Sequence, residues 1–302
     1  MKAAIHIESL SKSYRTPWRR QLVAAVRELN LTVAQGEAFG FVGPNGAGKS
    51  TTIRMLTGVL LPTQGSASLF GVGIADPQSR RGIGYVPENP YLNDCLTPLE
   101  VLQMSMRLHG VKVVNEYAHC MYWLERLDLA AASKKYLRSL SKGMVQRVAL
   151  AQAMCIQPRM LILDEPLSGL DPLGRRDVVN LLAEYKREGG TLFFTSHVLH
   201  DVERLADRFG LIKGGQLLTI SSPAGLAIDE QPFTVRYVGS ASINGAHLEA
   251  EGRWCAEVSG KSVWAVLEQV REQGGKLLEV KPALNLEKVF LSFIDEAAPV
   301  VP

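Results

Sequence analysis

The sequence predicts an α/β protein with a mainly parallel sheet, followed by a small α+β unit. Apolar segments of strand length alternate with helical segments over residues 38–213, which is typical of strands joined by crossover helices. A glycine-rich turn between a buried strand and a helix lies near the start of this region. A change of composition at residues 221–225, Ser-Ser-Pro-Ala-Gly, indicates where the second unit begins.

Three strands are expected before the first helix. Polar and apolar residues alternate from Ala4 to Glu8 and again from Leu29 to Val33, as in strands with one buried face. Ala38–Val42 is an uninterrupted apolar run and predicts a strand buried on both sides. From Ser50 through Leu56 the pattern is helical.

The middle of the chain alternates between helical periodicity and short apolar runs. The expected elements are helices at residues 98–108, 116–127 and 145–154 and buried strands at 160–163 and 191–195. Gly214-Gly215 lies between two apolar segments and predicts a hairpin that ends the first unit.

The second unit repeats both patterns on a smaller scale, within the size of an independent domain. Its expected elements are strands at residues 233–238, 254–258 and 277–280 and helices at 262–273 and 286–293.

The numbers of charged residues and cysteines limit the classes to which this protein can belong. The 302 residues carry 33 Lys and Arg against 30 Asp and Glu, a net charge of +3. This balance does not fit a disordered chain or a broad nucleic-acid surface. We expect no signal peptide and no membrane helix, which needs roughly 18 apolar residues in a row. The four cysteines are far apart without CxxC spacing, so we expect no disulfide or zinc framework and a reduced, cytoplasmic protein.

A phosphate-binding loop is the first functional motif. Residues 43–50, Gly-Pro-Asn-Gly-Ala-Gly-Lys-Ser, match GxxxxGK[ST] in full and lie between a buried strand and a helix. Backbone N–H groups of such loops hold phosphates at the positive end of the helix. In this motif Lys49 reaches the β- and γ-phosphates, and the Ser50 hydroxyl ligates Mg²⁺. The predicted nucleotide-binding residues are Gly43, Pro44, Asn45, Gly46, Ala47, Gly48, Lys49, Ser50 and Thr51.

Two adjacent acids, Asp164 and Glu165, end the apolar strand at residues 160–163. We expect Asp164 to hold Mg²⁺ through water and Glu165 to orient or deprotonate the attacking water. Taken alone, two acids at a strand end are as often only solvated. The phosphate-binding loop earlier in the chain favours the catalytic interpretation.

Further motifs resemble those of one family. Residues 140–147, Leu-Ser-Lys-Gly-Met-Val-Gln-Arg, resemble the signature LSGGQxQR of ATP-binding cassette (ABC) ATPases. Ser168-Gly169-Leu170-Asp171 matches the family's D-loop, and His197 matches its switch histidine. Tyr14 matches the aromatic residue that stacks on adenine. The motifs occur in family order over residues 4–220, and the chain is identified as a member of this family.

The resemblance implies a P-loop NTPase fold of the ABC type. It comprises a mainly parallel core sheet, an N-terminal antiparallel β subdomain and a helical signature subdomain at about residues 89–155. We accordingly assign residues 1–222 to the nucleotide-binding domain and residues 223–302 to an accessory α+β domain.

The resemblance also implies an ATPase that works as a head-to-tail dimer, of two identical chains or with a paralogue, around two ATP molecules and Mg²⁺. The catalytic residues it implies are Glu165, His197 and Lys49. Each ATP is assigned to Lys49, Ser50, Asp164, Tyr14 and His197 of one subunit and to Ser141 and Gly143 of the other. Asp171 of the D-loop is also assigned to nucleotide binding.

Two departures from the family pattern affect the site. Lys142 and Met144 replace Gly and Gln of the signature, but Ser141 and the backbone at Gly143 can still donate to a phosphate. Glu88 stands where the family usually has its Q-loop glutamine, and it is assigned to both nucleotide and Mg²⁺. Its extra charge either weakens ATP binding slightly, or makes the site more Mg²⁺-dependent, or is neutral.

The C-terminal residues indicate which branch of the ABC family the chain resembles. Residues 223–226 and 286–291 resemble the ending of stand-alone ATPases of type-2 ABC exporters, in which a separate transmembrane permease carries the cargo. This implies export, with the ATPase held by its permease at the inner face of the cell membrane. An ordinary amphipathic helix is the alternative for residues 286–291. A non-transport ABC ATPase that signals to a membrane complex is the alternative function.

The N-terminal arm is basic. Residues 1–27 hold six Lys and Arg and one Glu, a charge of +5, which leaves −2 for the rest. Compared with the family, a short insertion here includes Trp18, Arg19 and Arg20. Contact with anionic lipid headgroups or an acidic partner is one interpretation. A solvated hairpin tip is the other.

Overall fold

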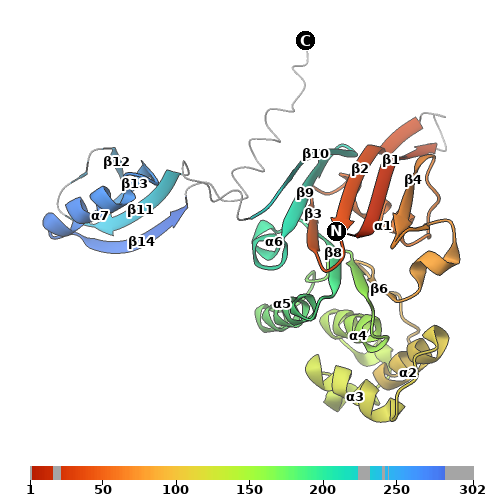
Figure 1. Cartoon of the computed structure of the whole chain (residues 1–302). Coiled ribbons are helices and arrows are strands. Elements are labelled where there is room, and N and C mark those ends of the chain that lie inside the picture. Colours follow the sequence, from red (N-terminus) through yellow and green to blue (C-terminus); the bar gives the residue numbers. More distant parts are fainter. Residues whose placement is uncertain (1, 16–21, 224–231, 240–241, 244, 283–302) are drawn as a thin grey trace. The chain divides into compact units, whose positions relative to one another are not determined.

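The computed structural model describes residues 2–15, 22–223, 232–239, 242–243 and 245–282. The chain divides into two compact units, Met1–Ile220 and Ser221–Pro302, which are treated separately below. Figure 1 shows the elements of each unit.

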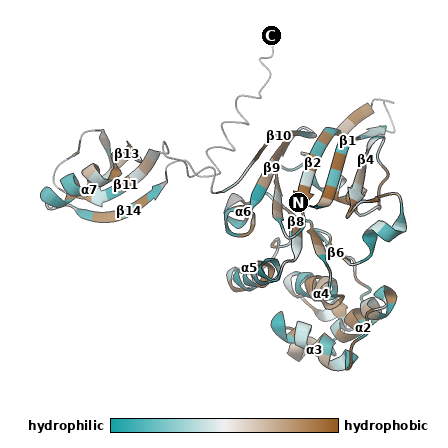
Figure 2. Cartoon of the chain, in the orientation of Figure 1, coloured by the Kyte–Doolittle hydropathy of each residue, from teal (hydrophilic) through white to brown (hydrophobic). Residues whose placement is uncertain are grey.

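An antiparallel sheet forms the N-terminal part of the first unit. Its strands lie in the order β2-β1-β4-β5, with bounds β1 Ala3–Arg15, β2 Leu22–Ala34, β4 Gln64–Leu69 and β5 Val72–Gly73. In Figure 2 hydrophobic and hydrophilic residues alternate along β1 and β2, because one face of each strand is buried. Both strands extend beyond the predicted segments, since they pair with each other as far as Arg15 and Leu22. The basic insertion lies between these two residues, outside the described part of the chain.

The core sheet of the first unit has six strands in the order β10-β9-β3-β8-β7-β6. Their bounds are β3 Ala38–Val42, β6 Ile83–Val86, β7 Met160–Leu163, β8 Thr191–Ser196, β9 Arg208–Lys213 and β10 Gln216–Ser221. The five strands from β9 to β6 are parallel. Every residue of β3, β7 and β8 is buried, and the rings of Phe39 and Phe193 stack at 5.9 Å. The predicted α/β class with a mainly parallel sheet is confirmed.

Six α-helices accompany the two sheets in the described part of the first unit. Their bounds are α1 Lys49–Leu56, α2 Pro98–His109, α3 Glu116–Arg126, α4 Lys142–Cys155, α5 Pro172–Arg187 and α6 Leu199–Leu205. Helices α2, α3 and α4 pack on one another and form a helical group (Figure 1). Helix α4 begins before the predicted Val145, because the Ser141 hydroxyl caps its first turn. The sequence interpretation missed α5 and α6, as well as β4, β5 and β6.

The second unit is a four-stranded antiparallel sheet with one helix in its described part. The strand order is β12-β13-β11-β14, with bounds β11 Pro232–Val238, β12 Ala246–Ala250, β13 Arg253–Ser259 and β14 Lys276–Pro282. Helix α7 Val263–Glu272 shares a small core with the sheet that includes Val235, Tyr237, Val266 and Val270. The helix expected at residues 286–293 lies outside the described residues. Edge strand β12 was not predicted, because four of its five residues are exposed.

Candidate active site

The parallel register of the core sheet gathers four loops at one edge. Val42 at the end of β3 pairs with Ser196 of β8, and Leu163 at the end of β7 pairs with Phe194 of β8 and with Val86 of β6. Because neighbouring parallel strands end at the same edge, the segments that follow them come together there. These segments hold the P-loop, the adjacent acids, the predicted Q-loop position and the predicted switch histidine.

The P-loop packs so closely on its neighbours that two of its glycines have no room for a side chain. A Cβ atom at Gly43 would overlap the carbonyl oxygen of Ile212, and one at Gly48 would lie 2.5 Å from the carbonyl oxygen of Ala25. Gly48 also has φ of 109° and caps α1. The loop is therefore held against β2 and β9, with its backbone turned toward the start of α1.

The ammonium group of Lys49 is buried inside the P-loop. Its Nζ donates to the carbonyl oxygens of Gly43 at 2.6 Å and Pro44 at 3.3 Å. It also lies 3.6 Å from Oε1 of Glu165. Since the side chain is only 7% exposed, these oxygens compensate for the desolvation of its charge.

Glu165 lies between two basic groups. Oε2 of Glu165 is 2.8 Å from Nδ1 of His197, while its other oxygen faces Lys49. The residue has φ of 50°, a conformation that is uncommon outside glycine. Its backbone N–H donates to Oγ1 of Thr195 at 2.9 Å, which helps to hold this turn. The carboxylate is thus fixed beside the P-loop, as a group that accepts a proton or orients water must be.

Thr195 is a functional residue that the sequence interpretation missed. Its hydroxyl donates to Oδ1 of Asp164 at 2.7 Å while it accepts from the N–H of Glu165. The backbone N–H of Asp164 in turn donates to the carbonyl oxygen of Val86. One buried hydroxyl therefore positions both acids. A polar residue at the end of the predicted buried strand 191–195 was the available signal.

A cavity of about 330 Å³ opens over the P-loop, within the size range of small-ligand sites. It is lined by Ala25, Asn45, Gly46, Ala47, Gly48, Lys49, Ser50, Thr51, Glu88, Glu165 and His197. Gly43 and Pro44 lie behind this surface as partners of Lys49, and Asp164 is buried next to it. Ala25 also lines the cavity, although it belongs to none of the sequence motifs described above.

The acids and hydroxyls here fit Mg²⁺. Ser50, Asp164 and Glu88 offer only oxygen atoms, which are the ligands that this ion prefers. Asp164 is 3% exposed and Glu88 is exposed, so a bound ion would have one buried and one solvated carboxylate nearby.

The signature and D-loop residues form a second group, outside the lining of the cavity. Ser141 accepts from the N–H of Met144 at the start of α4. Nε2 of Gln146 donates to the carbonyl oxygen of Pro166, and Nη2 of Arg147 donates to Oδ1 of Asp171 at 3.1 Å. Gly143 packs against Gly169 in the same region. The segment after Glu165 is therefore tied to the first turns of the signature helix.

Tyr14 lies near the end of β1, opposite Val23. It is 39% exposed, and Nζ of Lys12 lies 5.6 Å from the centre of its ring. Tyr14 is not among the lining residues of the cavity.

A P-loop between β3 and α1, with two acids after β7 of the same parallel sheet, defines a P-loop nucleotide hydrolase. The family model for the ABC transporter matches residues 26–168. An ABC transporter ATP-binding protein of Synechocystis, sll0415, is 38% identical over 94% of this chain and 79% of its own length. The Nod factor export ATP-binding protein I of Rhizobium sp. strain N33 is 34% identical over 96% of both chains. The chain belongs to the ABC transporter family, as an ATP-binding subunit with ATPase activity.

Solved structures agree on the fold of the first unit. A dimeric ABC cassette, MJ0796, in a post-hydrolysis state bound to ADP and Pi matches with a TM-score of 0.68 and 22% identity. The match covers 72% of this chain and 98% of that chain. An ATP-binding subunit of an ABC transporter matches with a TM-score of 0.65 and 29% identity, over 72% and 90% of the two chains. Within the described ranges of this chain, no helix is long and apolar enough to span a membrane.

Proposed function

We propose that this chain dimerises head to tail around two ATP molecules and drives export of a substrate through a separate transmembrane permease. Relatives named for export support the direction: the Nod factor export protein is 34% identical over nearly its whole length. The bacitracin transport ATP-binding protein BcrA of Bacillus licheniformis is 37% identical over 72% of this chain. In this proposal the permease holds the ATPase at the inner face of the cell membrane.

The contacts of Glu165 carry the catalytic part of the proposal. Its carboxylate lies 2.8 Å from His197 and 3.6 Å from Lys49, beside the loop that receives the phosphates. Glu165 accepts the proton of the attacking water or orients it, and His197 holds the carboxylate toward the γ-phosphate. Lys49 exchanges the loop carbonyls for phosphate oxygens. Ser50, Asp164 and Glu88 would hold Mg²⁺, which would neutralise phosphate charge.

The positions of the signature residues support a dimer. Ser141 is exposed and Gly143 is half-buried at the start of α4, and neither lines the cavity of its own chain. Their backbone and hydroxyl donors complete the site of a second subunit in this proposal. Asp171 acts from the adjoining D-loop, and half-exposed Tyr14 stacks on adenine.

Replacement of the proposed base tests this mechanism. We expect Glu165→Gln to abolish ATP hydrolysis and to trap an ATP-bound dimer, because the amide keeps the shape of the side chain without its basicity. Single-turnover hydrolysis and size-exclusion chromatography with ATP and Mg²⁺ measure both effects. Glu188→Gln, at the exposed end of α5, is the matched control and should hydrolyse ATP like the unchanged chain. Near-native turnover of Glu165→Gln would remove Glu165 from this role.

Coupling to a permease needs a separate experiment. The chain is co-expressed with the membrane protein encoded by the adjacent reading frame and reconstituted in vesicles. We expect the permease to raise ATP turnover, and Glu165→Gln to abolish that increase. An ATPase rate that is indifferent to every such membrane protein would favour a role outside transport.

A further inference from the structure

A row of polar side chains crosses the sheet of the second unit on the face away from α7. Arg236 of β11 pairs with Glu279 of β14 on one side and with Cys255 of β13 on the other. Cys255 in turn pairs with His247 of edge strand β12. Their strand neighbours, such as Val235 and Trp254, belong to the core shared with α7. Because side chains alternate along a strand, the polar row faces the opposite side.

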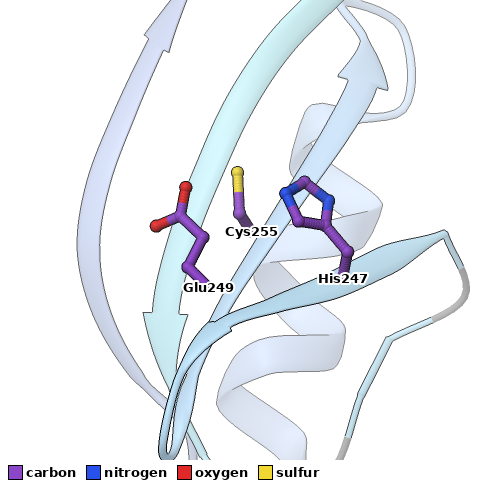
Figure 3. A group of neighbouring side chains, drawn as sticks. All are labelled: His247, Glu249 and Cys255. Carbon is purple, nitrogen blue, oxygen red and sulfur yellow. The ribbon is translucent and has the colours of Figure 1, made fainter.

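Three potential metal ligands converge at the β12 end of this row. His247 and Glu249 are separated by one residue on β12 and therefore share a face, and Cys255 lies directly opposite His247. The imidazole nitrogen, carboxylate oxygen and thiol sulfur all lie within 4.8 Å of one another. In the view of Figure 3 the sulfur of Cys255 lies between the carboxylate and the imidazole.

The chemistry of this donor set selects the metal. A thiolate and an imidazole are poor ligands for Mg²⁺ or Ca²⁺ but suit Zn²⁺, which also accepts a carboxylate. A thiolate and a carboxylate together carry the two negative charges that balance a divalent ion. We propose that His247, Glu249 and Cys255 form a Zn²⁺ site with water in the fourth position. The site lies outside the ATPase machinery and does not depend on the proposed transport function.

The geometry needs only a small contraction. Zn²⁺ bonds are about 2.3 Å to sulfur and about 2.0–2.2 Å to nitrogen and oxygen, so the three donor atoms must draw closer than their present spread. Edge strand β12 can follow, because its pairing with β13 is irregular between Leu248 and Ala250. His247 and Glu249 are exposed and Cys255 is buried beneath them, so the two longer side chains lie over the thiol on the solvent side.

The ion pair of Glu249 with Arg236 opposes binding. Nε of Arg236 lies 3.1 and 3.0 Å from the two carboxylate oxygens of Glu249. Nη1 of Arg236 also donates to Glu279 at 2.6 Å, so the guanidinium keeps an acceptor when Glu249 turns to the metal. The thiol releases its proton on binding, and the new S–Zn bond replaces the S–H bond.

Cobalt(II) is the probe for the test, because its bond to a thiolate gives a charge-transfer absorption that oxygen ligands do not give. The full chain is titrated with Co²⁺ in the absence of nucleotide, and Zn²⁺ is then added in competition. We expect the thiolate–cobalt absorption to appear at one equivalent and to vanish with Zn²⁺. We expect Cys255→Ser and His247→Ala to weaken binding more than about 100-fold, since even outer-shell partners of a metal are worth about 10–100-fold.

Matched controls separate this site from other ligands in the chain. Cys95→Ser removes an exposed cysteine of the first unit and should leave the absorption unchanged. His247 is exposed, so His247→Ala should keep the folded far-ultraviolet dichroism without metal. Zn²⁺ should raise the melting temperature of the unchanged chain and of Glu165→Gln, but not of His247→Ala. The proposal would be overturned if Co²⁺ bound without the thiolate–cobalt absorption, or if His247→Ala bound Co²⁺ with the affinity of the unchanged chain.

Discussion

The hydroxyl of Thr195 positions two adjacent acids, Asp164 and Glu165, from within the core sheet. It is fully buried, donates to Asp164 and accepts from the N–H of Glu165, whose φ of 50° is otherwise unfavourable. Thr195 does not itself line the cavity and acts through its contacts with Asp164 and Glu165. It is a positioning residue, and its loss should affect the chemical step more than binding.

We expect Thr195→Val to lower kcat by about tenfold or more, with a smaller change in KM. Valine keeps the shape but leaves Oδ1 of Asp164 and the N–H of Glu165 without this partner, at a cost of about 1–3 kcal/mol in unfolding free energy. Steady-state ATP hydrolysis and denaturant unfolding measure the two effects.

Thr191→Val is the matched control, on the same buried strand. The Thr191 hydroxyl accepts from the N–H of Gly36, away from the P-loop, so its removal should cost similar stability and spare kcat. If kcat fell equally in both variants, the effect of Thr195→Val would come from a general loss of stability and not from the positioning of Asp164 and Glu165.

Contacts between elements connect the helical group to the rest of the first unit. Arg126 at the end of α3 makes a bidentate pair with Glu184 of α5, at 3.1 and 2.7 Å. Hydrogen bonds from Arg126 hold the pKa of Glu184 below its ordinary value of 4.5. The signature helix α4 is tied to the D-loop in the same manner, through Arg147 and Asp171. The helical group is thus positioned by charged contacts in addition to apolar packing.

The stabilisation from Glu184 should depend on pH. Because the folded pKa is lowered, the contribution is complete above the unfolded value of 4.5 and is lost as pH falls through the folded pKa. We expect the melting-temperature difference between the unchanged chain and Glu184→Gln to be largest near neutral pH and to shrink below pH 4.5. Thermal unfolding monitored by circular dichroism across this range measures it.

Glu188→Gln removes the same charge from the end of the same helix and provides the control for general charge effects. If the melting-temperature difference between the unchanged chain and Glu184→Gln stayed constant down to acidic pH, this would contradict a role for the ionised Arg126–Glu184 pair.

At the scale of the whole molecule, the described residues include a main hydrophobic core in the first unit and a small one in the second, and these two share no residue. The main core runs from Ala4 to Leu217 of the first unit, and the small core from Phe233 to Val270 of the second. All lining residues of the cavity over the P-loop lie between Ala25 and His197. Each unit therefore buries its own apolar surface, which is the condition for folding independently.

We expect a chain that ends at Ser222 to bind ATP with the affinity of the full chain. Nucleotide titration and circular dichroism compare the two, and the shortened chain should lose the Zn²⁺-dependent rise in melting temperature. Aggregation of the shortened chain, or a large loss of ATP affinity, would show that the first unit depends on the second.

Local patterns account for much of what could be predicted. The P-loop, the buried strands β3 and β7 and the first turn of α1 follow from spacing and composition within a few residues. The pattern at α5 was also present, since Val178, Val179, Leu182 and Tyr185 are buried at helical spacing, but the sequence interpretation did not use it. Edge strand β12 lacked such a signal because its residues are mostly exposed.

The sequence by itself determined the phosphate-binding loop, the acids Asp164 and Glu165 and the family, because these depend on residues that are neighbours along the chain. Only the tertiary structure decided that His197 and Lys49 flank Glu165, that Thr195 joins the two acids, and that Cys255 lies opposite His247. The physical reason is that strand register brings together residues far apart in the sequence, and periodicity within one segment does not specify which strands pair.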